Sequence, residues 1–297
     1  MRLHARVSVA CVIALHAIIA ALPASASGIT GGVITYTVAR GETLSALAAR
    51  FGVYASTIVT DNQLDPRHQL EAGRRIRIDN QHIVPATAAP DEIVVNVPQR
   101  MAFYGDGGRV LAYAVAVGRT TWRTPAGPFT VVRKQEHPAW HVPDSIREES
   151  AAKGHPLPAV VPPGPRNPLG RFWIGLSLSG IGIHGTPFPS TVYSTSTHGC
   201  LRMQAEPIAD LYSRVVVGTA GRIVYEPILI VAIGGDVYLE VHEDVYRRLP
   251  GSAHQQAREI AARLGVGDRV DWTIADREID RRAGVARNVR LAPYATR

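Results

Sequence analysis

The N-terminal segment constrains this chain most, because it indicates an exported protein whose folded part holds a single cysteine. Arg2 and Arg6 form a positively charged start, and residues 7–22 are mostly apolar. The segment then ends in Ala-Ser-Ala, the small-residue pattern of a signal-peptidase site. We therefore predict a cleaved signal peptide over residues 1–26. The apolar stretch is short for a membrane-spanning helix, which needs about 20 residues.

Cleavage there leaves one thiol in the mature chain. The sequence contains two cysteines, of which Cys11 would leave with the signal peptide and Cys200 would remain. No disulfide can then form within one mature chain, so the fold depends on its apolar core. An unpaired thiol in an oxidising compartment is open to oxidation, and therefore usually either has a use or is deeply buried.

The formal charge of +7 indicates an anionic partner. No run of Lys and Arg marks a nucleic-acid patch, so we expect no nucleic-acid partner. A polyanionic matrix such as a cell wall fits the charge as well.

Residues 34–79 carry the pattern of a small strand–helix–helix–strand unit. Residues 34–38 alternate β-branched and aromatic side chains, as a short strand does. Thr43 is a candidate N-cap for a helix with apolar residues at i, i+3, i+4 and i+7, and Gly52 ends that pattern. A second short helix and a closing strand over 75–78 complete the unit.

This unit resembles the LysM module. The matching segments are Tyr36-Thr37-Val38, Gly41-Glu42-Thr43-Leu44 and the closing stretch from Leu70 to Ile78. The resemblance implies a β-α-α-β fold that binds the N-acetylhexosamine glycan of peptidoglycan or chitin. A small α+β domain without a ligand is the alternative. Residues 80–90, with two prolines and several alanines, are expected to be a linker.

Residues 91–226 have the composition of a mostly β domain. An Asp-Gly-Gly hairpin signal and a single helical pattern, from about Ala205 to Val216, accompany six apolar segments. Residues 134–170 hold eight prolines, and so long a loop inside a domain is more often a functional lid than filler. Residues 227–297 form a small α+β C-terminal region. The six predicted strands are residues 92–97, 101–104, 110–117, 130–133, 171–178 and 222–225.

The residues around the lone thiol suggest nucleophilic catalysis. Cys200 lies two residues after His198 and sixteen after His184. A nucleophilic cysteine needs an imidazole nearby as proton acceptor. His198 is too close in sequence for its ring to meet the thiol easily, so we predict Cys200 as nucleophile and His184 as general base.

The turn before the thiol offers further candidates. Gly199 permits a sharp turn that aims the amides of His198, Gly199 and Cys200 into one concavity, as an oxyanion hole requires. A helix starting just after Cys200 would lower the pKa of the thiol. Arg202 and Thr197 are candidate substrate-binding residues. For Arg202, a carboxylate clamp and a structural salt bridge are both open.

These segments resemble the signature of the L,D-transpeptidases, the YkuD catalytic domain. The match lies in His184-Gly185-Thr186 and in Ser196-Thr197-His198-Gly199-Cys200-Leu201-Arg202-Met203. Residues 124–127, 162–170 and 237–242 are also similar to this family. The resemblance implies a YkuD-type β-sandwich with a long lid loop and one or two helices.

The resemblance also implies a cysteine acyltransferase acting on peptidoglycan. Cys200 would form a thioester with the tetrapeptide stem, with release of D-alanine, and the backbone carbonyl of Gly185 would orient His184. The acceptor amine would be diaminopimelate, giving a 3→3 cross-link, or the lysine of an outer-membrane lipoprotein. The family needs no metal and no organic cofactor, is acylated by carbapenems, and its similar branch works in the periplasm of Gram-negative bacteria.

Two other functions remain open on the sequence. The same thioester could be resolved by water, which would make the protein an L,D-carboxypeptidase or amidase. A non-catalytic wall-binding protein that acts through its LysM module is the other alternative.

Overall fold

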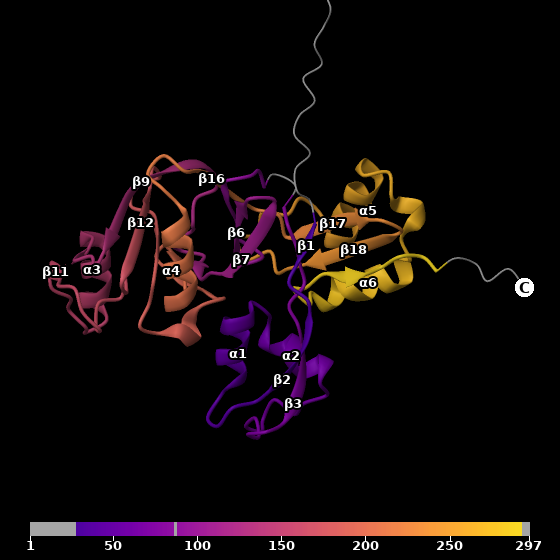
Figure 1. Cartoon of the computed structure of the whole chain (residues 1–297), viewed down its shortest axis with the longest axis horizontal. Coiled ribbons are helices and arrows are strands. Elements are labelled where there is room, and N and C mark those ends of the chain that lie inside the picture. Colours follow the sequence, from indigo (N-terminus) through magenta and orange to yellow (C-terminus); the bar gives the residue numbers. More distant parts are fainter. Residues whose placement is uncertain (1–27, 86–87, 293–297) are drawn as a thin grey trace, which may run out of the picture.

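The computed structural model describes residues 28–85 and 88–292 (Figure 1). The expected signal peptide, residues 1–26, lies outside them. Along the described chain come a small α/β unit, a large β domain and an α+β C-terminal region, which confirms the predicted fold class. Within these residues no helix has both the length and the apolar character to cross a bilayer.

The first unit has the predicted strand–helix–helix–strand order. Strand β2 (Val33–Thr37) pairs antiparallel with β3 (Arg75–Asp79), and α1 (Leu44–Phe51) and α2 (Ala55–Asp61) lie between them in sequence. The hydroxyl of Thr43 accepts the amide of Ala46 at 3.1 Å and caps α1, as predicted. Gly52 ends the helix at φ +66°, a conformation that favours glycine.

The β domain is built on one eight-stranded sheet, in the order β15-β13-β12-β9-β16-β5-β6-β7. Two further pairs, β14 with β8 and β10 with β11, flank it. The strands are β5 (Ile93–Asn96), β6 (Met101–Asp106), β7 (Arg109–Ala114), β8 (Val117–Gly118), β9 (Gly127–Glu136), β10 (Trp140–His141), β11 (Val160–Val161), β12 (Phe172–Leu176), β13 (Gly182–His184), β14 (Thr195–Thr197), β15 (Leu201–Arg202) and β16 (Ala220–Val224).

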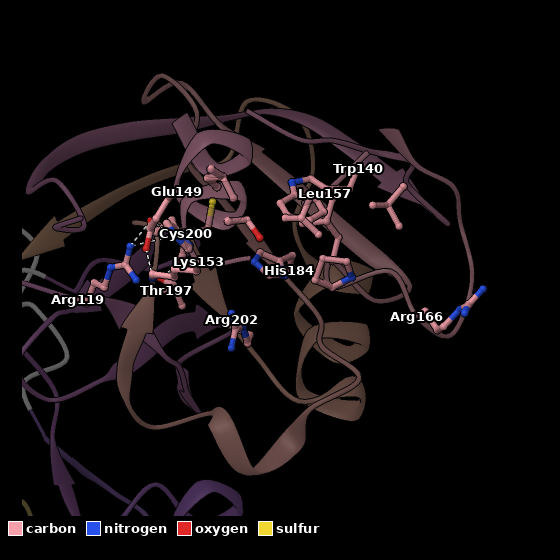
Figure 2. Close-up of a pocket in the computed structure, with 16 residues that line it drawn as sticks. Arg119, Trp140, Glu149, Lys153, Leu157, Arg166, His184, Thr197, Cys200 and Arg202 are labelled. Atoms are coloured by element: carbon pink, nitrogen blue, oxygen red, sulfur yellow. Dashed lines mark hydrogen bonds and ion pairs between the residues drawn. The ribbon is translucent and has the colours of Figure 1, made fainter. Parts of the chain in front are cut away.

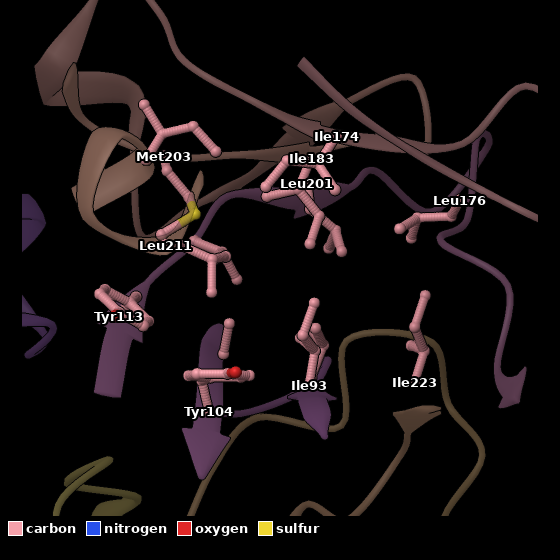
Figure 3. Packing of buried hydrophobic residues seen from close by; sticks show 14 of the residues in the cluster. Ile93, Tyr104, Tyr113, Ile174, Leu176, Ile183, Leu201, Met203, Leu211 and Ile223 are labelled. Carbon is pink, nitrogen blue, oxygen red and sulfur yellow. The ribbon is translucent and has the colours of Figure 1, made fainter. Parts of the chain in front are cut away.

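The two halves of this sheet enclose the main core. Ile174 of β12 and Ile183 of β13 lie on one side, and Ile93 of β5 and Ile223 of β16 face them (Figure 3). Helix α4 (Ala205–Arg214) packs Ile208 and Leu211 into the same cluster. Full burial of each such side chain is worth about 1.5–3 kcal/mol, so this core fixes the strands that carry the site.

The C-terminal region has its own core. Strands β17 (Ile228–Ile233) and β18 (Asp236–Val241) form an antiparallel pair, and β19 (Arg287–Asn288) adds a third strand. Helices α5 (Ala253–Arg263) and α6 (Trp272–Arg281) bury Ala257, Ala261 and Ile279 against them. Short 3₁₀ turns lie at η1 (Pro189–Thr191) and η2 (Gly267–Arg269).

The segment expected to be a linker is packed into the protein. Strand β4 (His82–Ile83) pairs with β1 (Ile29–Thr30), and His82, Val84 and Ala88 are buried. The carboxylate of Glu240 accepts hydrogen bonds from His82 and from the amide of Ile83. The composition of residues 80–90 resembles a linker, but Glu240, more than 150 residues away, holds His82 and Ile83 in place.

The lid also contains an element that the sequence did not indicate. Helix α3 (Asp144–Ala152) lies between β10 and β11. None of its residues is buried, so it has no apolar stripe from which its periodicity could be predicted.

Candidate active site

Neighbouring strands bring the two predicted catalytic side chains together. Strands β13 and β15 run parallel, with Ile183 opposite Leu201 and His184 opposite Arg202. Cys200 directly precedes β15, so its backbone lies beside Gly182, the first residue of β13, two residues before His184. Cys200 and His184 both line a cavity of about 450 Å³, and Figure 2 shows them among its lining residues.

The imidazole of His184 is held in one orientation. Its Nδ1 lies 2.6 Å from the carbonyl oxygen of Gly185, which can only accept a hydrogen bond. Nδ1 therefore carries the proton, and Nε2 keeps its lone pair. The ring stacks on Trp173, with centroids 5.8 Å apart. Burial, together with the charge of Arg202, lowers the pKa of His184 to about 4, so the ring is neutral at pH 7.

The thiol of Cys200 is protonated in the resting site. Burial raises its pKa, against smaller opposing effects of the Gly182 backbone and the charge of Arg202. Its Sγ donates to the carbonyl of Gly180 at 3.4 Å. The expectation that a helix N-terminus would lower this pKa is wrong, because β15 separates Cys200 from α4, which begins at Ala205.

The hydroxyl of Thr197 closes the turn that carries the thiol. It donates to the carbonyl of Cys200 at 2.6 Å and accepts the amide of Gly199 at 3.2 Å. Two of our expectations change as a result. Thr197 is buried and engaged within the turn rather than free for substrate, and the amide of Gly199 is already bonded. Within residues 28–85 and 88–292, the amides of His198 and Cys200 have no protein acceptor, so both are free to donate to a bound group.

Arg202 adds a positive charge to the cavity wall. Its Nη1 donates to the hydroxyl of Thr191 at 2.9 Å, and its Nε is buried without a partner. Among the described residues no carboxylate forms an ion pair with Arg202, so the structure shows no partner for the salt bridge that the sequence left open. Its charge remains available to an anionic group in the cavity.

The lid supplies site residues that sequence reasoning missed. Glu149 of α3 bonds His198, with 2.9 Å between Oε2 and Nε2, and pairs with Arg119. A second cavity of about 740 Å³ shares Cys200 and His198 with the first. Glu149 lies 49 residues before His198, on a helix without periodicity, so no local signal in the sequence identifies this contact.

One cluster elsewhere has the residue types of a metal site. His82, Glu240 and His242 are the group of described residues whose ligating atoms lie within 4.8 Å of one another. Glu240 Oε1 is 2.7 Å from His82 Nδ1 and 2.8 Å from His242 Nε2. The other ring nitrogens contact the carbonyl of Gly52 and the hydroxyl of Tyr54. Every ring nitrogen has a hydrogen-bond partner, so the cluster fits a structural network rather than a metal site.

Comparisons with known proteins agree with this geometry. The L,D-transpeptidase catalytic domain family (YkuD) matches residues 90–230, and the LysM domain family matches residues 36–79. A probable L,D-transpeptidase of Escherichia coli, ErfK/SrfK, is 31% identical over 277 residues, which cover 89% of this chain and 88% of that protein. The chain belongs to the L,D-transpeptidase family.

Other L,D-transpeptidases are similar over a smaller share of the chain. A probable L,D-transpeptidase of Escherichia coli, YbiS, is 31% identical over 228 residues, or 74% of each chain. Among solved structures, the catalytic domain of the Enterococcus faecium L,D-transpeptidase is 22% identical, with a TM-score of 0.35, and the match covers 45% of this chain and 95% of that one. As an L,D-transpeptidase homologue, the protein is an acyltransferase of the YkuD type.

Proposed function

We propose that the protein is a peptidoglycan L,D-transpeptidase that uses Cys200 as a covalent nucleophile. The observation that carries this proposal is the pairing of Cys200 with a neutral, oriented His184 in one cavity. A thiol beside a neutral imidazole can be deprotonated as it attacks, which is the requirement for general-base activation.

The first half-reaction makes a thioester. Sγ of Cys200 attacks the carbonyl carbon at the L-centre of diaminopimelate in a tetrapeptide stem, and its proton passes to Nε2 of His184. The oxyanion is held by the amides of His198 and Cys200, where the loss of one donor typically costs about 3–4 kcal/mol. When the C–N bond breaks, D-alanine leaves and its amine takes the proton from His184.

The second half-reaction transfers the acyl group. An amine attacks the thioester carbonyl, the C–S bond breaks, and the Cys200 sulfur recovers a proton through His184. We propose the side-chain amine of diaminopimelate in a second stem, giving a 3→3 cross-link, with the lysine of an outer-membrane lipoprotein as the second candidate acceptor. Water as acceptor would give the carboxypeptidase.

The charge of the cavity supports a peptidoglycan stem as substrate. Arg119, Lys153, Arg166 and Arg202 line it, with Glu149 as the acidic residue among them. Stem peptides carry free carboxylates, for which this cationic wall is complementary. We further propose that the LysM module binds the glycan strand, that the protein works in the periplasm of a Gram-negative bacterium, and that carbapenems acylate Cys200.

Product analysis tests the proposal. The mature protein is incubated with a disaccharide-tetrapeptide, alone and with a lysine-terminated lipoprotein peptide, beside a Cys200→Ala control. A cross-linked dimer or a peptide adduct that requires Cys200 is the expected result. Tripeptide as the sole product would replace the transpeptidase with the carboxypeptidase. No turnover, with binding to sacculi retained, would leave the non-catalytic wall-binding protein.

A further inference from the structure

The lid helix α3 is held in place by few contacts. None of its residues is buried, and its N-cap residue, Pro143, offers no side-chain hydrogen bond. A nine-residue helix with neither an apolar face nor a cap is marginal in water. Its position over the cavity must therefore come from bonds to the body of the domain.

Glu149 provides those bonds. Its Oε2 pairs with the guanidinium of Arg119 (Figure 2). The same oxygen lies 2.9 Å from Nε2 of His198, a nitrogen that Nη2 of Arg119 also approaches to 3.1 Å. Among the described residues, no other side chain of α3 makes a hydrogen bond or ion pair outside the lid. Lys153, with Arg119 and His198, lowers the pKa of Glu149 to about 2, so the group is a carboxylate at neutral pH.

One partner of Glu149 belongs to the turn that carries the nucleophile, and the other lies on a segment bonded to that turn. His198 lies two residues before Cys200, and its ring packs edge-on against Trp122. The backbone amide of Arg119 donates to the carbonyl of Thr197 at 3.0 Å. Glu149 therefore joins the lid to the two segments that hold Cys200 in place.

Helix α3 lines both cavities. Ile146, one turn before Glu149 on α3, lines the cavity of about 450 Å³ and the cavity of about 740 Å³, and Cys200 lines both as well. If α3 moves away from His198, both cavities lose a wall and the thiol becomes more exposed.

We propose that Glu149 is a positioning residue for acyl transfer, docking the lid helix on the His198–Cys200 turn so that substrate is enclosed beside the thiol. The role rests on the proposed function. It acts through His198 and Arg119, and Glu149 itself takes no part in bond making.

Substitutions at two adjacent glutamates test the proposal. Glu149→Ala removes the contact, and Glu149→Gln keeps an acceptor oxygen but loses the charge. Glu148→Gln is the matched control, because Glu148 is exposed on the same helix and contacts neither His198 nor Arg119. Two assays are used. The first gives kcat and KM for D-alanine release, and the second gives the rate at which iodoacetamide alkylates Cys200.

We expect Glu149→Ala to lower kcat/KM about tenfold, mainly through KM, because lid residues act on substrate enclosure more than on the chemical step. The same variant should be alkylated about threefold faster or more, since local opening exposes the thiol. Glu149→Gln should be intermediate in both, and Glu148→Gln should match the wild type.

Unchanged KM and unchanged alkylation in Glu149→Ala would overturn the proposal. So would equal effects of the Glu148 and Glu149 substitutions, which would indicate general destabilisation of the helix. Alkylation needs no peptidoglycan substrate. If the wild type releases no D-alanine, the proposed function fails, while faster alkylation of Glu149→Ala would still show that Glu149 docks the lid.

Discussion

At the scale of the residue, His184 and Cys200 form a neutral pair rather than an ion pair. Burial lowers the pKa of His184 to about 4 and raises the pKa of the Cys200 thiol. In the proposed reaction, the thiol proton would therefore move during the attack rather than before it. Activation of the nucleophile therefore depends on the orientation of the His184 imidazole, which the carbonyl of Gly185 and the ring of Trp173 fix.

The pH dependence of acylation follows from this pair. His184 accepts a proton only in its neutral form, so the rate of D-alanine release should stay constant as pH falls from 7 and decline only around pH 4. Initial rates across this range measure the midpoint, with circular dichroism as the control for folding. A midpoint near 6.5, the ordinary histidine value, would show that burial does not control the base.

For Thr197 the prediction concerns stability, because its hydroxyl bonds two backbone groups of the turn that carries Cys200. Thr197→Val keeps the shape but leaves the amide of Gly199 and the carbonyl of Cys200 without this partner. We expect the free energy of unfolding to fall by about 1–3 kcal/mol. Thr197→Ser, which keeps the hydroxyl, should remain close to the wild type. Urea denaturation measures the stability of both variants. Equal stability of Thr197→Val and Thr197→Ser would show that the hydroxyl does not stabilise the turn.

The residue types in the sequence predicted the type of chemistry, but they did not predict the contacts within the site. A lone cysteine beside two histidines identified the nucleophile and base candidates before any geometry. The partners of Thr197 and Gly199 were not predictable, because they depend on how the turn folds around the hydroxyl. Glu149 was missed for the same reason, since its partners are far away in sequence.

At the scale of the element, local patterns predicted helices α1 and α4, each of which buries an apolar face. Helix α1 follows its stripe, its cap at Thr43 and its stop at Gly52. Helix α3 has no apolar stripe, so the sequence pattern predicts a loop at its position. A segment that is held by hydrogen bonds and ion pairs to distant residues shows no periodic pattern of apolar residues in the sequence.

The cap of α1 gives a direct test at this scale. Thr43→Ala removes the acceptor for the amide of Ala46 and should lower the free energy of unfolding by about 1 kcal/mol. Thr43→Ser keeps the acceptor, so its free energy of unfolding should stay close to that of the wild type. Chemical denaturation provides the measurement, and an Ala variant as stable as the Ser variant would count against the cap.

At the scale of the whole molecule, the three units share interior contacts. Ala283 and Val285 of the C-terminal region pack into the core of the LysM unit, and Thr57 donates to the carbonyl of Ala283 at 2.6 Å. Asp61 pairs with Arg281 and Arg287 across the same boundary. The composition of residues 80–90 could not reveal this, because the contacts come from the far end of the chain.

The buried Glu240 should be central to that arrangement. The two ring nitrogens of His82 contact the carbonyl of Gly52 and the carboxylate of Glu240, and that carboxylate also accepts the amide of Ile83. Although burial alone would raise it, His82 and His242 hold the pKa of Glu240 at about 2. Glu240→Gln should therefore cost about 3–5 kcal/mol of stability.

Calorimetry checks this prediction together with the coupling of the units. The wild type should unfold in one transition, and Glu240→Gln should unfold at a clearly lower temperature. Glu71→Gln, at an exposed position of the LysM unit, is the control. Separate transitions for the LysM unit and the β domain, or a Glu240→Gln variant as stable as Glu71→Gln, would contradict the shared interior.

The most direct test of the central claim is the intact mass of the protein, quenched in acid shortly after mixing with disaccharide-tetrapeptide, followed by peptide mapping. We predict an adduct equal to the substrate minus D-alanine, located on Cys200 and absent from Cys200→Ala. Turnover of the tetrapeptide with no adduct, or at an equal rate in Cys200→Ala, would show that the reaction does not pass through a thioester on this residue.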